Sequence, residues 1–319
     1  MAEYKVLVSD KLSPEGIKIF QQAPEIDVDV KVGMSKEELI SCIEQYHGLT
    51  VRSTTKVTAD VLAAATNLKV IGRAGIGVDN IDVDTASKRD ILVMNTPTGN
   101  RIATAEHTLA LMLALCRQLP QADASLRAGR WEKSKFMGVE LYAKTLGIIG
   151  LGNVGSAVAE RAKGLGMRVL AYDPHIVKER AQDLGVEPVQ LSQLLTESDF
   201  ISIHTPLTPE TQAMIGKKEI EAAKPGVRII NCARGGLVDE TALVEALQSG
   251  RVAGAALDVY ETEPLPPDHP LLKLDNVVLT PHLGAATAEA QQNVALDVAR
   301  QMVDFLVKGK VVNAVNCPS

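Results

Sequence analysis

Three ionisable side chains follow the last three apolar runs of the chain, and together they suit the oxidation of a 2-hydroxy acid. They are Arg234, Glu263 and His282. A guanidinium can hold a carboxylate through two parallel hydrogen bonds, which a lysine cannot do. A histidine, which ordinarily titrates at about pH 6.5, can take the hydroxyl proton during oxidation and return it during reduction. A carboxylate bonded to the ring would hold its tautomer and stabilise the imidazolium. We therefore expect these three residues to be the catalytic set.

The three side chains must be positioned by strands, and short apolar runs alternating with helical patterns, such as 36–46 and 59–65, predict parallel βα units. The expected strands are 6–8, 49–51, 70–71 and 91–94 in a first series, and 146–149, 169–172, 200–204, 227–231, 252–259 and 277–280 in a second. Ligands of open parallel sheets bind beyond the carboxyl ends of the strands. We therefore expect the three side chains to share one crevice with a cofactor. Taken singly, each has a structural alternative: an ion-paired loop arginine, a solvated acid and a histidine beside a turn.

A glycine-rich turn directly after the run 146–149 predicts a dinucleotide site. Gly150, Gly152 and Gly155 have the spacing of the G-x-G-x-x-G turn, in which the first two glycines shape the turn and admit a pyrophosphate and the third allows close helix packing. Asp173 ends the next strand and would accept hydrogen bonds from the adenosine ribose, where the extra phosphate of NADP would meet its charge. This favours NAD as the cofactor. The alternative for Asp173, which precedes Pro174, is a turn former, and the two roles are compatible.

The composition indicates an ordinary α/β protein of about two domains. The net charge of −6 and the 3% content of aromatic residues disfavour a nucleic-acid partner. The four cysteines, at 42, 116, 232 and 317, have neither disulfide-framework nor zinc-ligand spacing, so we expect no metal. The start of the chain lacks a signal-peptide pattern, and the longest apolar stretch, 109–116, is too short to cross a bilayer. We expect no membrane partner and a cytoplasmic location.

The order of the patterns predicts two parallel-sheet domains, Rossmann-like or flavodoxin-like, with a cleft between them. A nucleotide domain, 99–285, is inserted into a discontinuous substrate domain, 1–98 and 286–319. Segment 104–119 is apolar nearly all round and predicts a buried helix, while 287–307 is amphipathic and would return to the first domain. Of the other histidines, His107 and His204 are expected to pack or cap near the cofactor. The remaining three, expected at the surface, are His47, His175 and His269.

The chain resembles the D-isomer-specific 2-hydroxyacid dehydrogenase family over nearly its whole length. The segments that carry the resemblance are 51–57 (VRSTTKV), 72–80 (GRAGIGVDN), 131–138 (WEKSKFMG), 231–236 (NCARGG) and 281–284 (PHLG). The resemblance implies Arg234, Glu263 and His282 as the catalytic set. It also implies cofactor contacts at Asn153, Val154, Asp173, Thr205, Pro206, Cys232, Asp258, His282 and Gly284.

For the substrate, the resemblance implies that its carboxylate is held by Arg234, by Arg52 and Ser53, and by backbone around Gly75 and Gly77. These loop glycines would suit an anion nest. A phosphate would land on a basic cluster that includes Lys133 and Lys135, reached across a dimer interface. On residue types alone, that cluster, completed by Arg127 and Arg130, is more often an exposed linker of mixed charge.

The function that these segments imply is NAD-dependent oxidation of 3-phosphoglycerate to 3-phosphohydroxypyruvate, a step of serine biosynthesis, in a homodimer or a dimer-based tetramer. Hydroxypyruvate or glyoxylate reduction, or another D-2-hydroxyacid dehydrogenase activity, is the alternative, and an NAD-sensing binding protein of the co-repressor type is a more distant one. Asn153 and Ile76 depart from residues common among such enzymes, Arg at the first position and Thr or Val at the second, but both positions offer mainly backbone groups. Long family members continue beyond the equivalent of Ser319 into a regulatory domain that senses serine, so we expect no serine feedback in this chain.

Overall fold

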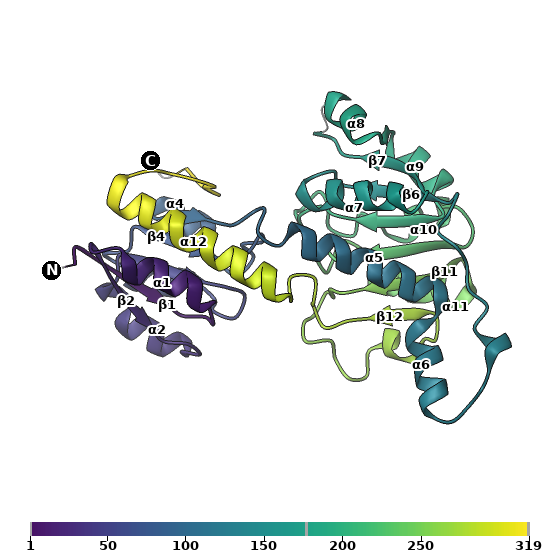
Figure 1. Cartoon of the computed structure of the whole chain (residues 1–319), viewed down its shortest axis with the longest axis horizontal. Helices are drawn as coiled ribbons and strands as arrows, with labels where there is room; N and C mark the ends of the chain where they lie inside the picture. Colours follow the sequence, from purple (N-terminus) through teal and green to yellow (C-terminus); the bar gives the residue numbers. More distant parts are fainter. Residues whose placement is uncertain (1, 176–177, 318–319) are drawn as a thin grey trace. The chain divides into compact units, whose positions relative to one another are not determined.

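The computed structural model describes residues 2–175 and 178–317, which divide into two compact units. Unit 1 comprises Met1–Arg101 and Ala286–Ser319, and unit 2 comprises Ile102–Ala285. The first division therefore falls between 101 and 102, whereas the sequence pattern places it between 98 and 99. Each unit is a parallel sheet with helices on both faces (Figure 1), so the predicted fold class of two parallel-sheet units, one inserted into the other, is confirmed.

Unit 1 contains a five-stranded parallel sheet in the order β2-β1-β3-β4-β5. The strands are β1 (Tyr4–Val8), β2 (Ile26–Val30), β3 (Gly48–Val51), β4 (Val70–Arg73) and β5 (Leu92–Met94). The helices are α1 (Pro14–Gln22), α2 (Lys36–Cys42), α3 (Ala59–Ala64), α4 (Val83–Lys88) and α12 (Ala288–Lys308). The strand order is that of flavodoxin-like folds.

Helix α12 brings the end of the chain back onto the unit-1 sheet, as the amphipathic pattern over 287–307 predicts. It begins at the Thr287 cap, whose side chain accepts from the Ala290 amide, and ends at Gly309 in a left-handed conformation. Its apolar face shares one core with β1 and α1 (Figure 1). Gly72 permits this approach, because a Cβ at that position would collide with Met302.

Two elements of unit 1 differ from the pattern. The helix predicted over 36–46 ends at Cys42 and continues as a short 3₁₀ helix, Ile43–Gln45. Strand β2 was not predicted, although Ile26, Val28 and Val30 alternate with aspartates as in a half-buried strand. It forms an edge of the sheet.

Unit 2 contains a seven-stranded parallel sheet in the order β12-β11-β10-β9-β6-β7-β8. The strands are β6 (Thr145–Ile149), β7 (Arg168–Tyr172), β8 (Glu187–Pro188), β9 (Phe200–Ile203), β10 (Val227–Asn231), β11 (Val252–Leu257) and β12 (Val277–Leu279). The longer helices are α5 (Arg101–Arg117), α6 (Leu119–Arg127), α7 (Asn153–Gly164) and α11 (Glu240–Ser249). Three shorter helices, α8 (Lys178–Leu184), α9 (Leu191–Glu197) and α10 (Lys217–Ala222), complete it, with 3₁₀ turns at Lys133–Lys135 and Pro270–Lys273.

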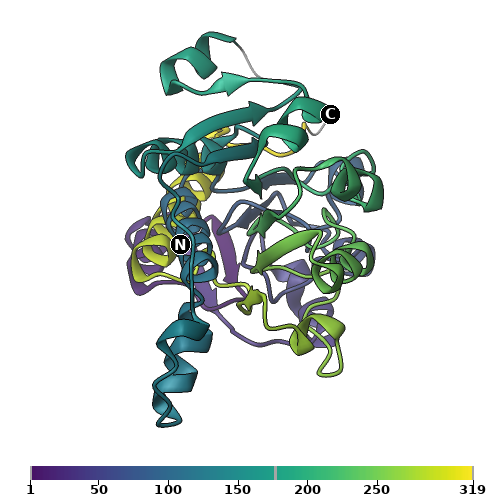
Figure 2. The same cartoon turned by 90° about the vertical axis from the view of Figure 1, so that its right-hand side faces the viewer.

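The strand order of unit 2 is the doubly wound order with one additional strand, and it reverses between β6 and β9. One core packs α5 and α7 against the sheet, and a second packs α9, α10 and α11 against the other face. The helix predicted over 104–119 stops at Arg117, because Gln118 adopts a left-handed conformation and a new helix, α6, begins with Pro120 in its first turn. Helix α6 extends away from the rest of unit 2 in both views (Figures 1 and 2).

Candidate active site

The glycine-rich turn lies where the strand order of unit 2 reverses, which is the usual position of a ligand in such sheets. Gly150 has a φ of +91°, and a Cβ there would lie 2.7 Å from the carbonyl oxygen of His204, at the end of the neighbouring strand β9. A Cβ at Gly155 would collide with the Gly150 carbonyl, so this glycine allows α7 to pack on the turn. At Gly152 a Cβ would meet nothing within 4 Å. Of the three glycines, only Gly152, one of the two expected to admit a pyrophosphate, therefore leaves open space at the Cβ position.

Helix α7 starts at Asn153 without a side-chain cap, with Gly152 in the capping position. An uncapped helix start favours an anion, because the first amides point out of the helix and carry its positive dipole end. Val154, also expected near the cofactor, packs in part against the core. These features fit the pyrophosphate of a dinucleotide.

Asp173 lies at the end of β7 and holds the glycine-rich turn. One carboxylate oxygen accepts from the Leu151 amide at 2.8 Å and the other from the His175 amide at 2.8 Å. The turn-forming role considered for Asp173 is thus present, and its position beside the glycines also suits a ribose.

His282 and Glu263 are in direct contact beyond the ends of β12 and β11. His282 Nδ1 lies 2.8 Å from Glu263 Oε2, while Glu263 Oε1 accepts from the Tyr260 amide at 3.1 Å. The contact assigns the ring proton to Nδ1, because an ionised carboxylate can only accept. Nε2 is then the nitrogen able to accept a proton. The His282 side chain is 51% exposed, so its ring is accessible.

The backbone of His282 is held by a buried aspartate. His282 has a φ of +55°, which is uncommon for a residue with a side chain. Its amide donates to the Asp258 carbonyl, and the Asp258 carboxylate accepts from the amides of Leu283 and Gly284 at 2.7 and 2.8 Å. His107 Nε2 and the Thr280 hydroxyl bind the same carboxylate. Burial alone would raise the pKa of Asp258, but the hydrogen bonds from His107, Thr280 and Leu283 outweigh burial and lower the pKa.

Arg234 lies in the loop after β10, next to the strands that carry Glu263 and His282. The Asn231 side chain shapes this loop, since it donates to the Arg234 carbonyl at 2.8 Å and accepts from the Ala233 amide at 3.0 Å. A Cβ at Gly235 would collide with the Tyr260 carbonyl, so the loop packs directly on the one that carries Glu263. The three predicted catalytic residues therefore lie on three adjacent loops at one edge of the sheet.

The other expected cofactor residues of unit 2 lie at the same edge with differing burial. Cys232 is buried, and burial raises the pKa of its thiol to about 12, so the thiol stays protonated. Asp258 is fully buried and Gly284 is bonded to it. Thr205 and Pro206 follow β9, directly after His204. Burial lowers the pKa of His204 to about 4, and the Ser202 hydroxyl forms a hydrogen bond with His204 Nε2.

Two sets of residues were missed or misplaced by the sequence pattern. Asn231 and Tyr260 shape the two loops, but an amide at a strand end and a tyrosine in an apolar run carry no distinctive signal. His269, expected at the surface, is largely enclosed, with Nε2 3.1 Å from Glu240 Oε2. His47 is also half-buried, whereas His175 is exposed as expected.

The expected substrate residues of unit 1 lie at the carboxyl ends of β3 and β4. Arg52 and Ser53 begin a loop that rests on Asp10, which accepts from the Arg52 amide at 2.6 Å and from the Thr55 amide and hydroxyl. Gly75 has a φ of +145°, and Gly77 follows in the same loop after β4. Both loops are positioned to offer backbone groups at this edge.

The basic cluster of unit 2 lies at the end of α6 and in the segment that follows this helix. Arg127 pairs with Asp123, and Arg130 and Lys135 pair with Glu132. Lys133 is exposed. These side chains have mixed-charge surroundings, as the linker alternative supposes.

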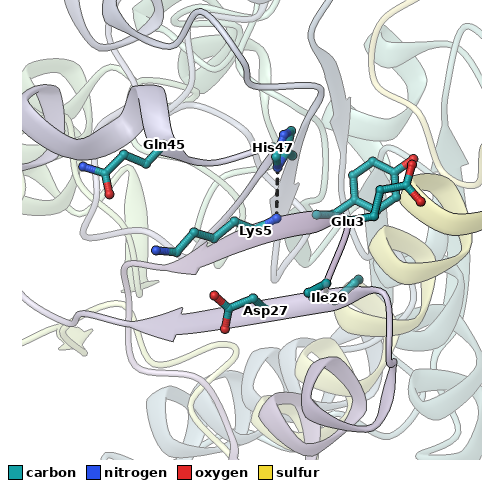
Figure 3. A pocket seen from close by; sticks show the side chains of 8 residues that line it. Glu3, Lys5, Ile26, Asp27, Gln45 and His47 are labelled. Carbon is teal, nitrogen blue, oxygen red and sulfur yellow. Dashed lines mark hydrogen bonds between the residues drawn. The ribbon is translucent and has the colours of Figure 1, made fainter.

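Unit 1 contains a hollow of about 560 Å³ (Figure 3). It lies at the edge of the unit-1 sheet opposite to the loops that follow β3 and β4. It is lined by the starts of β1 and β2 and by Gln45 and His47. His47 Nδ1 accepts from the Lys5 amide at 2.9 Å, and the Lys5 ammonium pairs with Asp29. These two polar groups are thus bonded within the fold, and the hollow holds none of the predicted site residues.

Among the residues that the structure describes, no group of three or more histidine, cysteine, aspartate or glutamate side chains is arranged to hold a metal ion. Over the same residues, no helix combines the length and apolar character needed to cross a membrane.

Comparison with known proteins agrees with this geometry. A family model described as "D-isomer specific 2-hydroxyacid dehydrogenase, NAD binding domain" matches residues 109–284, more than half of the chain. The match confirms the resemblance and the prediction of an NAD-binding domain.

Among curated proteins, the chain is 55% identical over 315 residues to a D-3-phosphoglycerate dehydrogenase of Archaeoglobus fulgidus, covering 99% of the chain and 60% of the relative. It is 50% identical to the human protein of that name, covering 98% of the chain and 58% of the relative. The chain thus spans about 60% of the length of such relatives.

Among solved structures, the TT0316 protein of Thermus thermophilus is 37% identical, with a TM-score of 0.89 over 98% of this chain and 100% of that one. A glyoxylate reductase of Paecilomyes thermophila is 31% identical, with a TM-score of 0.91 over 99% of both chains.

Proposed function

Because the chain belongs to the D-isomer specific 2-hydroxyacid dehydrogenase family, we propose that it oxidises 3-phosphoglycerate to 3-phosphohydroxypyruvate with NAD. The observation that carries the chemistry is the contact between His282 and Glu263, on loops adjacent to the one that bears Arg234. The choice of substrate is supported by the name that the curated relatives share.

In this reaction Arg234 binds the substrate carboxylate and the C2 oxygen through its planar set of donors, and so orients C2. His282 Nε2 accepts the proton of the C2 hydroxyl, while its Nδ1–H stays bonded to Glu263. The carboxylate of Glu263 faces the imidazolium that forms and stabilises it. NAD, held by the residues named below, would supply the acceptor for the hydride of C2. The C2–O bond thereby becomes a carbonyl, and one proton remains on His282.

The residues proposed to hold NAD are those of the glycine-rich turn and of the strand ends beside it. Gly150, Gly152, Asn153 and Val154 would face the pyrophosphate, with Gly155 supporting the turn, and Asp173 the ribose. The remaining proposed contacts are Thr205, Pro206, Cys232, Asp258, His282 and Gly284. Further substrate contacts are proposed at Arg52, Ser53, Gly75 and Gly77, with Lys133 and Lys135 for the phosphate.

We also propose a homodimer, or a tetramer built from it, through α6 and the segment that follows. Four large apolar side chains there are exposed, Leu119, Leu126, Trp131 and Met137, and Trp131 and Met137 are more than 80% exposed. Exposed apolar side chains grouped along one segment are typical of interaction sites. Trp131→Glu should lower the association state measured by sedimentation. A cytoplasmic location is proposed on the four cysteines, all free, at 42, 116, 232 and 317.

A substrate panel tests the proposed function. Purified protein is assayed for nicotinamide reduction with 3-phosphoglycerate, glycerate and lactate, and for oxidation of the reduced cofactor with glyoxylate and hydroxypyruvate, each with NAD and NADP forms. We expect turnover of 3-phosphoglycerate with NAD and loss of that turnover in His282→Ala. Turnover of glyoxylate alone would move the activity to the second candidate, which the likeness to the glyoxylate reductase supports. Cofactor binding with no turnover of any substrate would favour a binding protein.

A further inference from the structure

Glu240 and His269 form an enclosed pair beside the loop that carries Glu263, and the catalytic scheme above does not use them. Glu240 is the first residue of α11, at the end of the segment that begins with Arg234. His269 caps the 3₁₀ turn after the Glu263 loop, with Nδ1 accepting from the Leu271 amide at 3.3 Å. The exposed fractions of the two side chains are 10% and 19%.

The hydrogen bonds of the pair have a defined direction. Since His269 Nδ1 accepts from an amide, the proton of the neutral ring lies on Nε2 and is donated to Glu240 Oε2 at 3.1 Å. The other oxygen of Glu240 accepts from the Glu261 amide at 2.7 Å. In return, the Glu240 amide donates to the Glu261 carboxylate at 3.3 Å. Both ends of the segment 261–269 are thus bonded to one carboxylate.

This arrangement has an energetic cost that its hydrogen bonds must offset. Burial holds the pKa of Glu240 above its ordinary value, and the bonds from the Glu261 amide and from His269 lower the pKa only in part. Removing the donors of a buried carboxylate destabilises the fold, because the charge is left without hydrogen bonds. A solvated glutamate at the start of α11 would serve the helix dipole without that cost, so helix stability alone does not account for its enclosure.

The segment between these two bonded ends, 261–269, carries Glu263. Glu263 lies two residues after Glu261, and its carboxylate reaches His282 at 2.8 Å. On the other side, Gly235 packs on the Tyr260–Glu261 peptide, so the same anchor lies against the loop of Arg234. We propose that Glu240 and His269 act as a positioning pair that fixes the loops of Glu263 and Arg234 for the reaction at His282. This rests on the proposed function, since it assigns the pair to the same site.

Two substitutions at His269 separate this role from a purely structural one. His269→Gln places an amide donor where Nε2 lies and can keep the bond to Glu240. His269→Asn places its polar group near Nδ1, so it can keep the bond to the Leu271 amide but cannot reach Glu240. We expect His269→Asn and Glu240→Ala to lower kcat about tenfold with little change in the KM for NAD, because a small misplacement of a catalytic group is costly. His269→Gln should retain most of kcat.

A second measurement does not depend on turnover. The protein has six histidines, so ¹⁵N-histidine labelling gives a spectrum in which each ring tautomer can be assigned with His→Gln variants. We expect His282 to be an Nδ1–H ring in the wild type and in His269→Gln, and a mixture of tautomers in His269→Asn and Glu240→Ala. If no 2-hydroxy acid is turned over, the proposed function fails while this spectrum still tests the pair.

The outcomes that would overturn the positioning role are specific. One is an unchanged kcat and an unchanged His282 spectrum in folded His269→Asn and Glu240→Ala. The other is a loss of kcat in all three variants, His269→Gln included, that follows the unfolded fraction measured by circular dichroism. An additive effect of Glu240→Ala and His269→Asn in the double variant would also contradict it, because the two residues are proposed to act as one unit.

Discussion

The carboxyl edges of the two sheets hold their functional groups by different means. In unit 1, the loop of Arg52 and Ser53 is fixed through its backbone, by the buried carboxylate of Asp10. In unit 2, His282 is fixed twice: its backbone by Asp258 and its ring by Glu263. Binding an anion requires only a loop of suitable shape that presents donors, whereas proton transfer requires one orientation and one tautomer of a ring. The difference predicts that substitutions at the unit-2 edge should reduce the rate, and those at the unit-1 edge should weaken binding.

The largest effect is expected from removing the ring at the unit-2 edge. His282→Ala should lower kcat about 10²- to 10⁴-fold, because general acid–base catalysis contributes about that much. Its NAD affinity, measured by isothermal titration calorimetry, should change far less than kcat, because His282 is only one of many proposed NAD contacts. His47→Gln is the control, since His47 lies at the opposite edge of the unit-1 sheet. If His282→Ala instead lost NAD binding, and turnover fell only as much as the bound cofactor did, the assignment of His282 to proton transfer would be contradicted.

A matched pair of arginine substitutions compares the two edges directly. Arg234→Lys keeps the charge but removes the bidentate geometry. We therefore expect kcat/KM to fall about thirtyfold, which corresponds to a loss of about 2 kcal/mol of transition-state stabilisation, mainly through kcat. Arg52→Lys keeps the Arg52 amide bonded to Asp10, so it should act chiefly on KM and by less than Arg234→Lys. Steady-state kinetics over a range of substrate concentrations separates the two parameters. A larger effect on kcat at Arg52 than at Arg234 would reverse the comparison.

Asp173 has two roles in this comparison: it fixes the glycine-rich turn through its hydrogen bonds, and its charged side chain is proposed to bind the ribose of NAD. Asp173→Ala should weaken NAD about tenfold and reduce the discrimination against NADP, since a hydrogen-bonded charge is lost. Asp173→Asn keeps an acceptor for the Leu151 amide but removes the charge. The Asn variant should therefore lose less NAD affinity while still gaining in NADP binding. Dissociation constants for both cofactors check this, and a wild-type preference for NADP would disprove the ribose argument.

The sequence was sufficient where a residue type follows a strand, because strand ends of a parallel sheet converge on one edge. The runs 227–231 and 146–149 were predicted to within one residue of β10 and β6, and the contact between Glu263 and His282 follows from such placement. The predicted helix 104–119 was also present, but its end was misplaced, because the left-handed turn at Gln118 has no composition signal.

The second layer around the site could not be predicted from the sequence. The partners of Asp258 lie 22–151 positions away in the chain, as His107 and Thr280 illustrate. The pairing of Glu240 with His269 likewise depends on how two loops fold together, and His269 alone resembles an ordinary surface histidine. Strand β2 was missed for a different reason, since its apolar residues alternate with aspartates and do not form the continuous apolar run by which the other strands were predicted. The sequence pattern therefore predicts where most strands lie, but it does not predict long-range hydrogen bonds or the conformation of loops.

The smallest effect on the reaction is expected from the two buried aspartates that hold the loops. Asp258→Asn replaces one acceptor by a donor that faces the Leu283 and Gly284 amides, and should lower the free energy of unfolding by about 1–3 kcal/mol at neutral pH. Because the pKa of Asp258 is lowered in the folded state, its carboxylate stabilises the fold above the ordinary pKa of about 3.9, and this contribution is lost as pH falls below that value. The stability gap between wild type and Asp258→Asn should therefore narrow in acid.

Asp10→Asn is the counterpart in unit 1, where the amide would face the Arg52 and Thr55 amides. Hydrogen exchange followed by mass spectrometry should localise each loss to its own unit: segments 281–284 in Asp258→Asn, and 52–55 in Asp10→Asn. If the comparison holds, Asp258→Asn also lowers kcat, because the aspartate sets the His282 backbone, whereas Asp10→Asn raises KM with kcat nearly unchanged. A fall in kcat alone in Asp10→Asn would mean that the unit-1 loop takes part in the chemical step as well as in binding.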